Sequence, residues 1–354
     1  MKKLYVTLSF LCFMIVVPDA LLAQDQDTVK AYRESNEQKA RAFFNQGVSA
    51  YQDGNPDLAK SSFNKAIAKE AEFTKALMNR GIVNFEQKNY EAAIQDYNQV
   101  IRLESLPKAY FYRGIARFYL NELDLAIEDL QRATELNADY AKAWHFLGNS
   151  YFAQQDYKSA IQAFTKAIEA NKGFAKAYHD RGSAYYKQGK LQKALADYQT
   201  SISIGAEAAY KYSNLANLKC EMGEYQSALT DYKESINLDS SNASLYNLRG
   251  IVYFKTENYT KAIDDYTKAI MIDKNFAEAF NNRGNVYFKL GEYKKAVEDY
   301  NQAIQINEQY GVAFLNRGIT KEMQRLPEEA CKDWSKAFSL GIDSVKSFID
   351  KQCD

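Results

Sequence analysis

The sequence predicts an all-α protein in which helical hairpins stack into a solenoid that is closed at its C-terminal end by a capping helix. Two observations predict this fold. The same pattern of residue types returns every 34 residues, with one interval of 33, from Gly47 to Gly318. Only 4 of the 354 residues are proline, whereas 27 tyrosines and 20 phenylalanines supply large side chains, a composition that suits helices burying aromatic rings.

Residues 1–23 have the features of a secretory signal peptide. A short basic start precedes an apolar run, and Ala23 offers a small residue at the cleavage position. Pro18 and Asp19 interrupt the run before it reaches the roughly 20 residues that a membrane-spanning helix needs. We therefore expect cleavage before Gln24 and an exported mature chain, periplasmic or secreted, without a membrane span. The alternative is an uncleaved membrane anchor.

Residues 24–39 are polar, and we expect them to lead as a helix into the repeats, which occupy residues 40–340. Each copy is centred on a small anchor residue, from which we number the positions of that copy. The nine anchors are Gly47, Gly81, Gly114, Gly148, Gly182, Ala216, Gly250, Gly284 and Gly318. Position +12 is alanine in every copy, whereas positions −4 and +16 are large. Two amphipathic helices joined by a turn near +7 account for these spacings, because small residues allow helix axes to approach and large ones fill the remaining space.

Each predicted hairpin carries apolar residues on both sides and can bury them only against neighbouring hairpins. Such stacking produces a solenoid, whose terminal faces must be covered. Residues 341–354 predict one more helix, from about Ile342 to Gln352, that caps the last apolar face.

The stretch AWHFLGNSYFAQQDYKSAIQAFTKAI, residues 143–168, resembles the tetratricopeptide repeat (TPR) family, and the resemblance continues in phase over residues 40–340. It implies a right-handed α-solenoid of nine helix–turn–helix repeats. It also implies that the first helices line a concave groove in which peptides or partner domains bind. The proline common near the end of the family's repeat is mostly missing, Pro107 being the nearest instance.

Charged residues recur at two positions of the apolar pattern. Six copies carry arginine at −1 and seven carry aspartate at +15, positions that lie at equal height on antiparallel helices. We predict six structural ion pairs: Arg80–Asp96, Arg113–Asp129, Arg181–Asp197, Arg249–Asp265, Arg283–Asp299 and Arg317–Asp333. Asp231 has no arginine in its own copy, which carries Leu215 at −1. The alternative function of the arginines is a ladder of ligand-binding groups.

The cysteines predict one disulfide. Cys331 lies on the second helix of the ninth copy, and Cys353 ends the capping helix that we expect to pack beside it. An exported protein keeps such a bridge oxidised, so we predict a Cys331–Cys353 disulfide. The alternative is a pair of reduced thiols, and we expect Cys220 to be a buried small residue.

The repeat pattern predicts a groove that is basic and aromatic in its first five copies. Lysine recurs at −6 and aromatic residues at +4. The candidate partner-binding residues are Lys75, Lys108, Phe118, Lys142, His145, Asn149, Phe152, Lys176, His179 and Tyr186. Aromatic side chains are typical interface hot spots, and a lysine row suits an acidic segment. The alternative is that the aromatic rings pack between adjacent first helices and the lysines are solvated.

We predict an exported, non-catalytic scaffold or adaptor that docks a protein or peptide partner, with an acidic partner fitting the lysine row. The sequence offers no nucleophile elbow, phosphate loop or metal motif, so we expect no enzymatic activity, no cofactor and no metal. His145 and His179 share position −3, but no third ligand accompanies them. The 45 basic and 45 acidic residues cancel, which argues against a nucleic-acid partner. The alternative function is a carbohydrate- or cell-wall-binding module that uses the aromatic groove.

Overall fold

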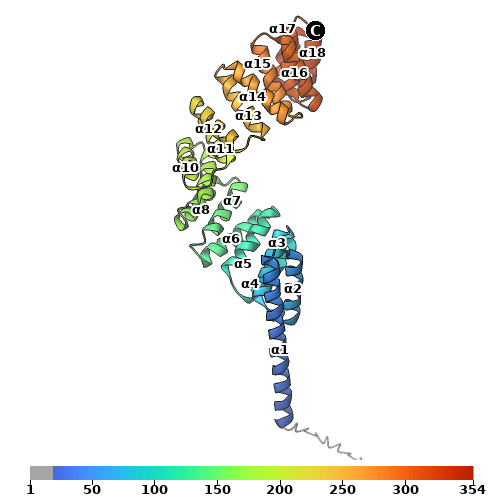
Figure 1. Cartoon of the computed structure of the whole chain (residues 1–354). Helices are drawn as coiled ribbons and strands as arrows, with labels where there is room; N and C mark the ends of the chain where they lie inside the picture. The colour runs from blue at the N-terminus through green and yellow to red at the C-terminus, as the bar shows by residue number, and fades with distance from the viewer. Residues whose placement is uncertain (1–18, 354) are drawn as a thin grey trace, which may run out of the picture. The chain divides into compact units, whose positions relative to one another are not determined.

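The computed structural model describes residues 19–353 (Figure 1). These residues form helices joined by short turns, with no β-strand among them, so the all-α prediction is confirmed. The predicted signal peptide, residues 1–23, lies mostly outside the described residues. From residue 19 onward, no helix combines the length and the hydrophobicity that crossing a membrane requires.

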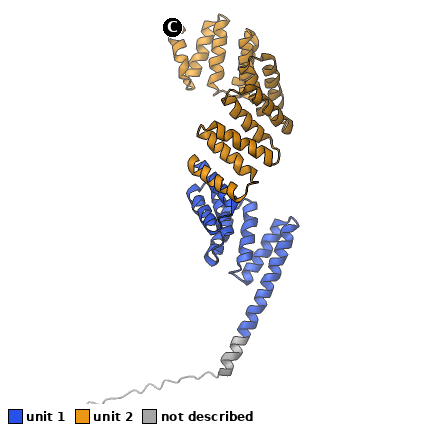
Figure 2. Cartoon of the chain, turned by 90° about the vertical axis from the view of Figure 1, so that its left-hand side faces the viewer, with its two compact units in different colours: residues 1–154 blue, residues 155–354 orange. Residues whose placement is uncertain are grey.

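The chain divides into two compact units, residues 1–154 and 155–354 (Figure 2). Unit 1 contains α1 (Asp19–Gln52), α2 (Pro56–Lys69), α3 (Thr74–Glu86), α4 (Tyr90–Leu103), α5 (Pro107–Tyr119), α6 (Leu123–Leu136) and α7 (Ala141–Ala153). Unit 2 contains α8 (Tyr157–Ala170), α9 (Ala175–Lys187), α10 (Leu191–Ile204), α11 (Ala209–Glu221), α12 (Tyr225–Leu238), α13 (Ala243–Lys255), α14 (Tyr259–Ile272), α15 (Ala277–Lys289), α16 (Tyr293–Ile306), α17 (Gly311–Met323), α18 (Pro327–Ser339), η1 (Asp343–Val345) and α19 (Lys346–Gln352). The first helix, α1, includes residues 24–39.

Within each unit, consecutive helices pack side by side, and the two helices of one repeat form a hairpin. First helices of successive repeats also touch, as α3 touches α5 and α15 touches α17. The alanine at +12 is completely buried in all nine copies: Ala59, Ala93, Ala126, Ala160, Ala194, Ala228, Ala262, Ala296 and Ala330. The predicted solenoid of helix–turn–helix repeats is therefore confirmed within each unit.

The anchor glycine lies directly against the large residue at +16. A Cβ atom on Gly284 would meet the Tyr300 ring at 2.7 Å, and one on Gly47 would meet the Phe63 ring at 2.6 Å. Carbon atoms in protein interiors pack at about 3.5–4.0 Å. Glycine at the anchor thus lets the second helix place its largest side chain against the first helix.

The turn between the two helices has the same backbone conformation in all nine copies. The residue at +7 has a left-handed φ between 57° and 81°, at Gly54, Lys88, Asn121, Gln155, Gly189, Gly223, Glu257, Gly291 and Arg325. One left-handed residue ends a helix and redirects the chain. The turns therefore fall where the sequence predicts them.

The C-terminal end of unit 2 is closed by η1 and α19. Val345 is fully buried, and the Phe348 ring stacks on Trp334 with centroids 5.2 Å apart. Ile342, where the predicted capping helix begins, precedes η1 and packs against the same cluster. These contacts cover the apolar face that the ninth repeat would otherwise expose.

Candidate functional site

The arginines at −1 and the aspartates at +15 contact each other in all six predicted hairpins. Arg283 donates from Nε and Nη2 to the two carboxylate oxygens of Asp299, at 2.9 and 2.7 Å. The other pairs are Arg80–Asp96, Arg113–Asp129, Arg181–Asp197, Arg249–Asp265 and Arg317–Asp333. Burial raises the pKa of Asp299, and the hydrogen bond from Arg283 partly offsets that effect. The aspartate therefore depends on its cation to remain ionised in a largely dry environment.

Most of these arginines also reach the preceding repeat. Arg283 donates from Nη1 to Thr267 Oγ1 at 3.0 Å. Equivalent bonds join Arg80 to Asn64, Arg113 to Asn98, Arg181 to Thr165 and Arg317 to Asn301. One guanidinium thus ties the two helices of its own hairpin to the hairpin before it. Because Nε, Nη1 and Nη2 all have partners inside the protein, the geometry favours a structural role over the ligand-binding ladder.

Asp231, which has no arginine in its own copy, is paired with Lys219. The Lys219 Nζ atom lies 2.6 Å from Asp231 Oδ2. This pair was not predicted, although Lys219 stands four residues after Leu215 and so lies on the same face of α11. Position +3 also supplies a second cation elsewhere, in the contacts of Arg117 with Asp129 and Lys321 with Asp333.

The predicted lysine row is exposed. Lys75, Lys108, Lys142 and Lys176 each occupy the second residue of a first helix, the first three in unit 1 and Lys176 in unit 2. Asn149, predicted to lie in the same groove, is half-buried on α7. The structure brings one of these lysines, Lys108, to a pocket.

This pocket has a volume of about 370 Å³ and lies between α1, α3 and α5 of unit 1. Val48 of α1, Ile82 of α3 and the Phe63 ring of α2 supply apolar surface. Asn79 and Lys108 add an amide and an ammonium group to the lining. A mostly apolar cavity with a few polar groups is the usual composition of a binding site, and its size is in the range of ligand pockets.

Two tyrosines in the lining of the pocket contact its charged groups, Glu86 and Lys108. The Tyr51 hydroxyl donates to Glu86 Oε1 at 2.6 Å, and this bond raises the pKa of Tyr51 to about 12, with burial adding to the shift. Lys108 Nζ lies 5.8 Å from the centroid of the Tyr112 ring, over its face. Within residues 28–353, Lys108 makes no ion pair, whereas the Glu86 carboxylate is already held by Tyr51. The pocket therefore offers an unpaired cation beside an aromatic wall.

The prediction that His145 and His179 line an open groove was wrong. His145 is 2% exposed and His179 is 6% exposed. His179 Nε2 accepts a hydrogen bond from Asn214 Nδ2 at 3.0 Å, and Nδ1 donates to Asp180 Oδ1 at 3.1 Å. The His179 ring also packs on Tyr198. Position −3 is buried in seven of the nine copies, so its side chains are covered and do not line an open groove.

The aromatic candidates at +4 are half-buried. The Phe118 ring contacts Phe146 with centroids 6.3 Å apart, and Phe152 is covered to a similar extent. Tyr186 in unit 2 is hydrogen-bonded to Glu221, which raises the pKa of Tyr186 to about 12 together with burial. These rings pack against neighbouring helices and also leave part of their surface to solvent.

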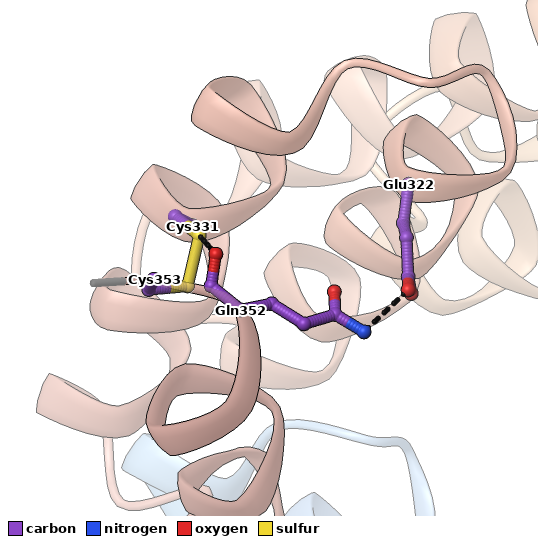
Figure 3. Close-up of a disulfide and its surroundings, with 4 residues drawn as sticks. All are labelled: Glu322, Cys331, Gln352 and Cys353. Carbon is purple, nitrogen blue, oxygen red and sulfur yellow. Dashed lines mark hydrogen bonds between the residues drawn. A yellow bond between two sulfur atoms is a disulfide. The ribbon is translucent and has the colours of Figure 1, made fainter.

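The structure joins Cys331 of α18 to Cys353 at the end of α19 in a disulfide (Figure 3). Beside it, Gln352 Nε2 donates to Glu322 Oε1 at 2.6 Å, so the last helix is tied to both helices of the ninth repeat. Cys220 is a half-buried free thiol whose pKa is raised by burial. The described side chains contain no group of three residues suited to hold a metal ion.

These features define the class of the protein: an α-solenoid of helix–turn–helix repeats with buried ion pairs and an open pocket on its first helices. The chain belongs to the tetratricopeptide repeat family, and its fold is that of a protein-interaction scaffold. Two models described as tetratricopeptide repeat match residues 175–204 with 277–310, and 44–109. A third, described as TPR repeat, matches residues 114–154, 148–189, 216–257 and 252–291.

Solved structures share the fold at low sequence identity. A tetratricopeptide repeat protein from Parabacteroides merdae ATCC 43184 is 20% identical, with a TM-score of 0.53 over 70% of this chain and 99% of that chain. PilF of Pseudomonas aeruginosa is 15% identical, with a TM-score of 0.53 over 63% and 99%. A chain of the Cut9–Hcn1 complex is 16% identical, with a TM-score of 0.52 over 84% and 60%. No curated protein sequence matches the chain.

Proposed function

We propose that this chain is an exported, non-catalytic scaffold that holds a segment of a partner protein against the first helices of unit 1. The observation that carries the proposal is the pocket between α1, α3 and α5, which combines apolar walls with the unpaired ammonium group of Lys108. The proposed ligand is a segment with an apolar side chain beside a carboxylate. The side chain enters the pocket and the carboxylate meets Lys108.

Charge and position support this ligand. Lys75 on α3 and Lys108 on α5 occupy the same position of neighbouring repeats, and both are exposed. Glu86, the carboxylate in the lining of the pocket, is engaged by Tyr51. An acidic ligand thus gains from the ammonium group of Lys108, and Val48, Phe63 and Ile82 supply apolar contacts beside it.

Export and the absence of catalysis are part of the same proposal, with the mature chain in the periplasm or secreted. The basic start and apolar run of residues 1–23 support export, as does the Cys331–Cys353 disulfide, since such bonds persist in oxidising compartments. The aspartates at +15, the obvious acid–base candidates, are all paired with cations of their own repeats.

The test is capture of peptides from a pool of random 12-residue sequences by the immobilised full chain. Enriched peptides should place an apolar residue next to Asp or Glu. Lys108→Glu should weaken them at least tenfold in fluorescence polarisation, and Val48→Trp, which fills the pocket, should do the same. Lys142→Glu is the matched control, because Lys142 has the same position in its repeat but does not line the pocket. Equal binding by all four proteins would overturn the assignment of the site.

A second candidate function, carbohydrate binding, is favoured by one observation. Tyr119 at the end of α5 is 54% exposed, and it stacks on Tyr90 with ring centroids 5.3 Å apart and an interplanar angle of 8°. An exposed ring that is supported by a second, partly buried ring offers a flat apolar surface of the kind on which sugar rings pack. Retention on purified peptidoglycan or polysaccharide that is lost in Tyr119→Ala would support this function, and no retention by the unmodified chain would dismiss it.

A further inference from the structure

The C-terminal cap of unit 2 has two parts that are held in different ways. The first part, η1, is anchored by its own side chains. Val345 is fully buried, and Ile342 packs on Gly311, where an added Cβ atom would lie 2.7 Å from Ile342 Cγ1. The second part, α19, has seven residues, none of which is fully buried. A helix of that length is not stable by itself in water, so α19 depends on the contacts that fasten it to repeat nine.

The noncovalent contacts of α19 are weak. The Phe348 ring stacks on Trp334 with centroids 5.2 Å apart, an arrangement that adds only modestly to the burial of the two rings. Gln352 Nε2 donates to Glu322 Oε1 at 2.6 Å, but this hydrogen bond is exposed, so water can replace either partner. Such contacts do not by themselves hold a seven-residue helix in place.

The disulfide is the strong contact of this helix. It joins Cys331 of α18 to Cys353, the residue that follows α19, at a sequence separation of 22 (Figure 3). A bond that closes a segment of this length removes most of the open conformations of the segment, so α19 stays docked while the bond is intact. Both cysteines are only partly buried, so a thiol in solution can approach their sulfur atoms.

We propose that the Cys331–Cys353 disulfide is a redox latch: a dithiol reductant opens it and releases α19, while η1 and repeat nine stay folded. One thiolate of the reductant attacks a cysteine sulfur, the S–S bond breaks, and the other sulfur leaves as a thiolate that takes up a proton. The second thiol of the reductant then displaces the first cysteine from the mixed disulfide. Both cysteines end as thiols, and the reductant ends as a disulfide.

Release of α19 uncovers apolar surface at the end of unit 2. Trp334 is 0% exposed while Phe348 covers one face of its ring. Phe338 is already 43% exposed and stands four residues further along α18, on the same side of that helix as Trp334. The latch therefore determines whether the apolar face of repeat nine is covered. It lies in a different unit from the pocket beside Lys108 and does not depend on the ligand proposed there.

The test compares limited trypsin digestion of the full chain before and after treatment with dithiothreitol, a small dithiol. Lys346 and Lys351 are exposed but helical, and a protease cleaves a helix only after the helix opens locally. We expect reduction to speed cleavage at these two lysines about tenfold or more, with cleavage in the other repeats unchanged. Oxidised glutathione should restore the protection. Mass spectrometry of the untreated chain should find Cys331 and Cys353 in linked peptides.

Fluorescence gives a second measurement of the same release. The chain has two tryptophans, so in the variant Trp144→Phe all tryptophan emission comes from Trp334. Reduction should shift this emission to longer wavelength, because water reaches the indole ring once Phe348 has left. The helical signal in circular dichroism should stay nearly unchanged, since α19 contributes only seven residues to it.

Two further variants separate the disulfide from the other contacts. Cys353→Ser lacks the bond and should be cleaved without reductant as fast as the reduced chain, with no further response to dithiothreitol. Phe348→Ala keeps the bond and should stay protected until it is reduced. Equal protection before and after reduction, fast cleavage of oxidised Phe348→Ala, or free thiols at both cysteines of the untreated chain would each overturn the inference. So would a large loss of helical signal on reduction, because the bond would then stabilise the whole unit.

Discussion

Repeats six (α11 and α12) and eight (α15 and α16) fold into the same hairpin with different polar contacts. In repeat eight, Arg283 at −1 binds Asp299 and also donates to Thr267 of the preceding repeat. In repeat six, the arginine is missing and Lys219 at +3 lies against Asp231 instead. In both repeats the aspartate at +15 is paired with a cation, and either of two positions on the first helix can supply it.

The same two repeats differ at the anchor. Gly284 leaves room for the Tyr300 ring, whereas repeat six has Ala216 opposite Tyr232. Both tyrosines remain buried, and both donate to the asparagine at +1. Repeat six therefore accommodates a methyl group at the anchor and still buries the tyrosine at +16.

Repeat six also joins its neighbours differently. Lys211 occupies position −5, where seven of the nine copies have alanine, and it is 5% exposed. Its Nζ atom donates to the carbonyl oxygens of Ser201 and Ala206, each at 3.0 Å, and burial lowers its pKa. A cation at the C-terminal end of a helix satisfies carbonyl groups that have no partner in the helix. Lys211 thus holds the end of α10 and the irregular loop that follows it.

The largest expected effect comes from removing the aspartate at +15. Asp299→Ala should lower the free energy of unfolding by about 3 kcal/mol, because it leaves Arg283 in a largely buried position without its carboxylate. Asp231→Ala should cost about half as much, since the flexible lysine stem can carry its ammonium group to solvent. Urea denaturation followed by circular dichroism measures both.

The double variant Arg283→Leu with Asp299→Ala is the control for this pair. It should recover part of the loss, because neither charge remains buried alone. Equal losses in repeats six and eight, or no recovery in the double variant, would show that the two hairpins do not differ in the way proposed.

Much of the fold could be predicted because the period is enforced by packing. Alanine at +12 and a small residue at the anchor recur because large side chains at these positions would separate the helices. Arg283 and Asp299 can be paired by counting from the turn. The sequence therefore contained the hairpin, its turn and its ion pairs. The pairing of −1 with +15 does not predict Lys219, because this residue stands at +3, one helical turn further along the first helix.

The candidate site could be predicted only in part, because neighbouring positions on one helix face differ in exposure. His179 at −3 and Asp180 at −2 are adjacent in sequence, yet the histidine lies against the next first helix. That outcome depends on the distance and angle between first helices, which a repeat pattern does not specify. The pocket beside Lys108 likewise depends on side chains from four helices of unit 1.

The second-largest expected effect is a loss of stability when a methyl group is added at the anchor position. Gly284→Ala should destabilise by about 2 kcal/mol, since the added methyl group would meet the Tyr300 ring at 2.7 Å and force it to move. Ala216→Gly, the reverse change in repeat six, should cost only about 0.5–1 kcal/mol, the conformational entropy of glycine in a helix. Thermal unfolding of both variants tests this. A neutral Gly284→Ala would mean that the ring has room to spare.

The smallest expected effect is an increase in the free energy of unfolding. Before Arg249 of repeat seven, Lys233 occupies the position at which other repeats offer asparagine or threonine to the next arginine. Among the described residues, the side chain of Arg249 donates only to Asp265. Lys233→Asn should supply the acceptor and raise the free energy of unfolding by about 1 kcal/mol. Thr267→Lys, the matched change before Arg283, should lower it by a similar amount. If both substitutions leave the unfolding midpoint in urea unchanged, the bond between repeats contributes nothing measurable, and the arginines act within their own hairpins alone.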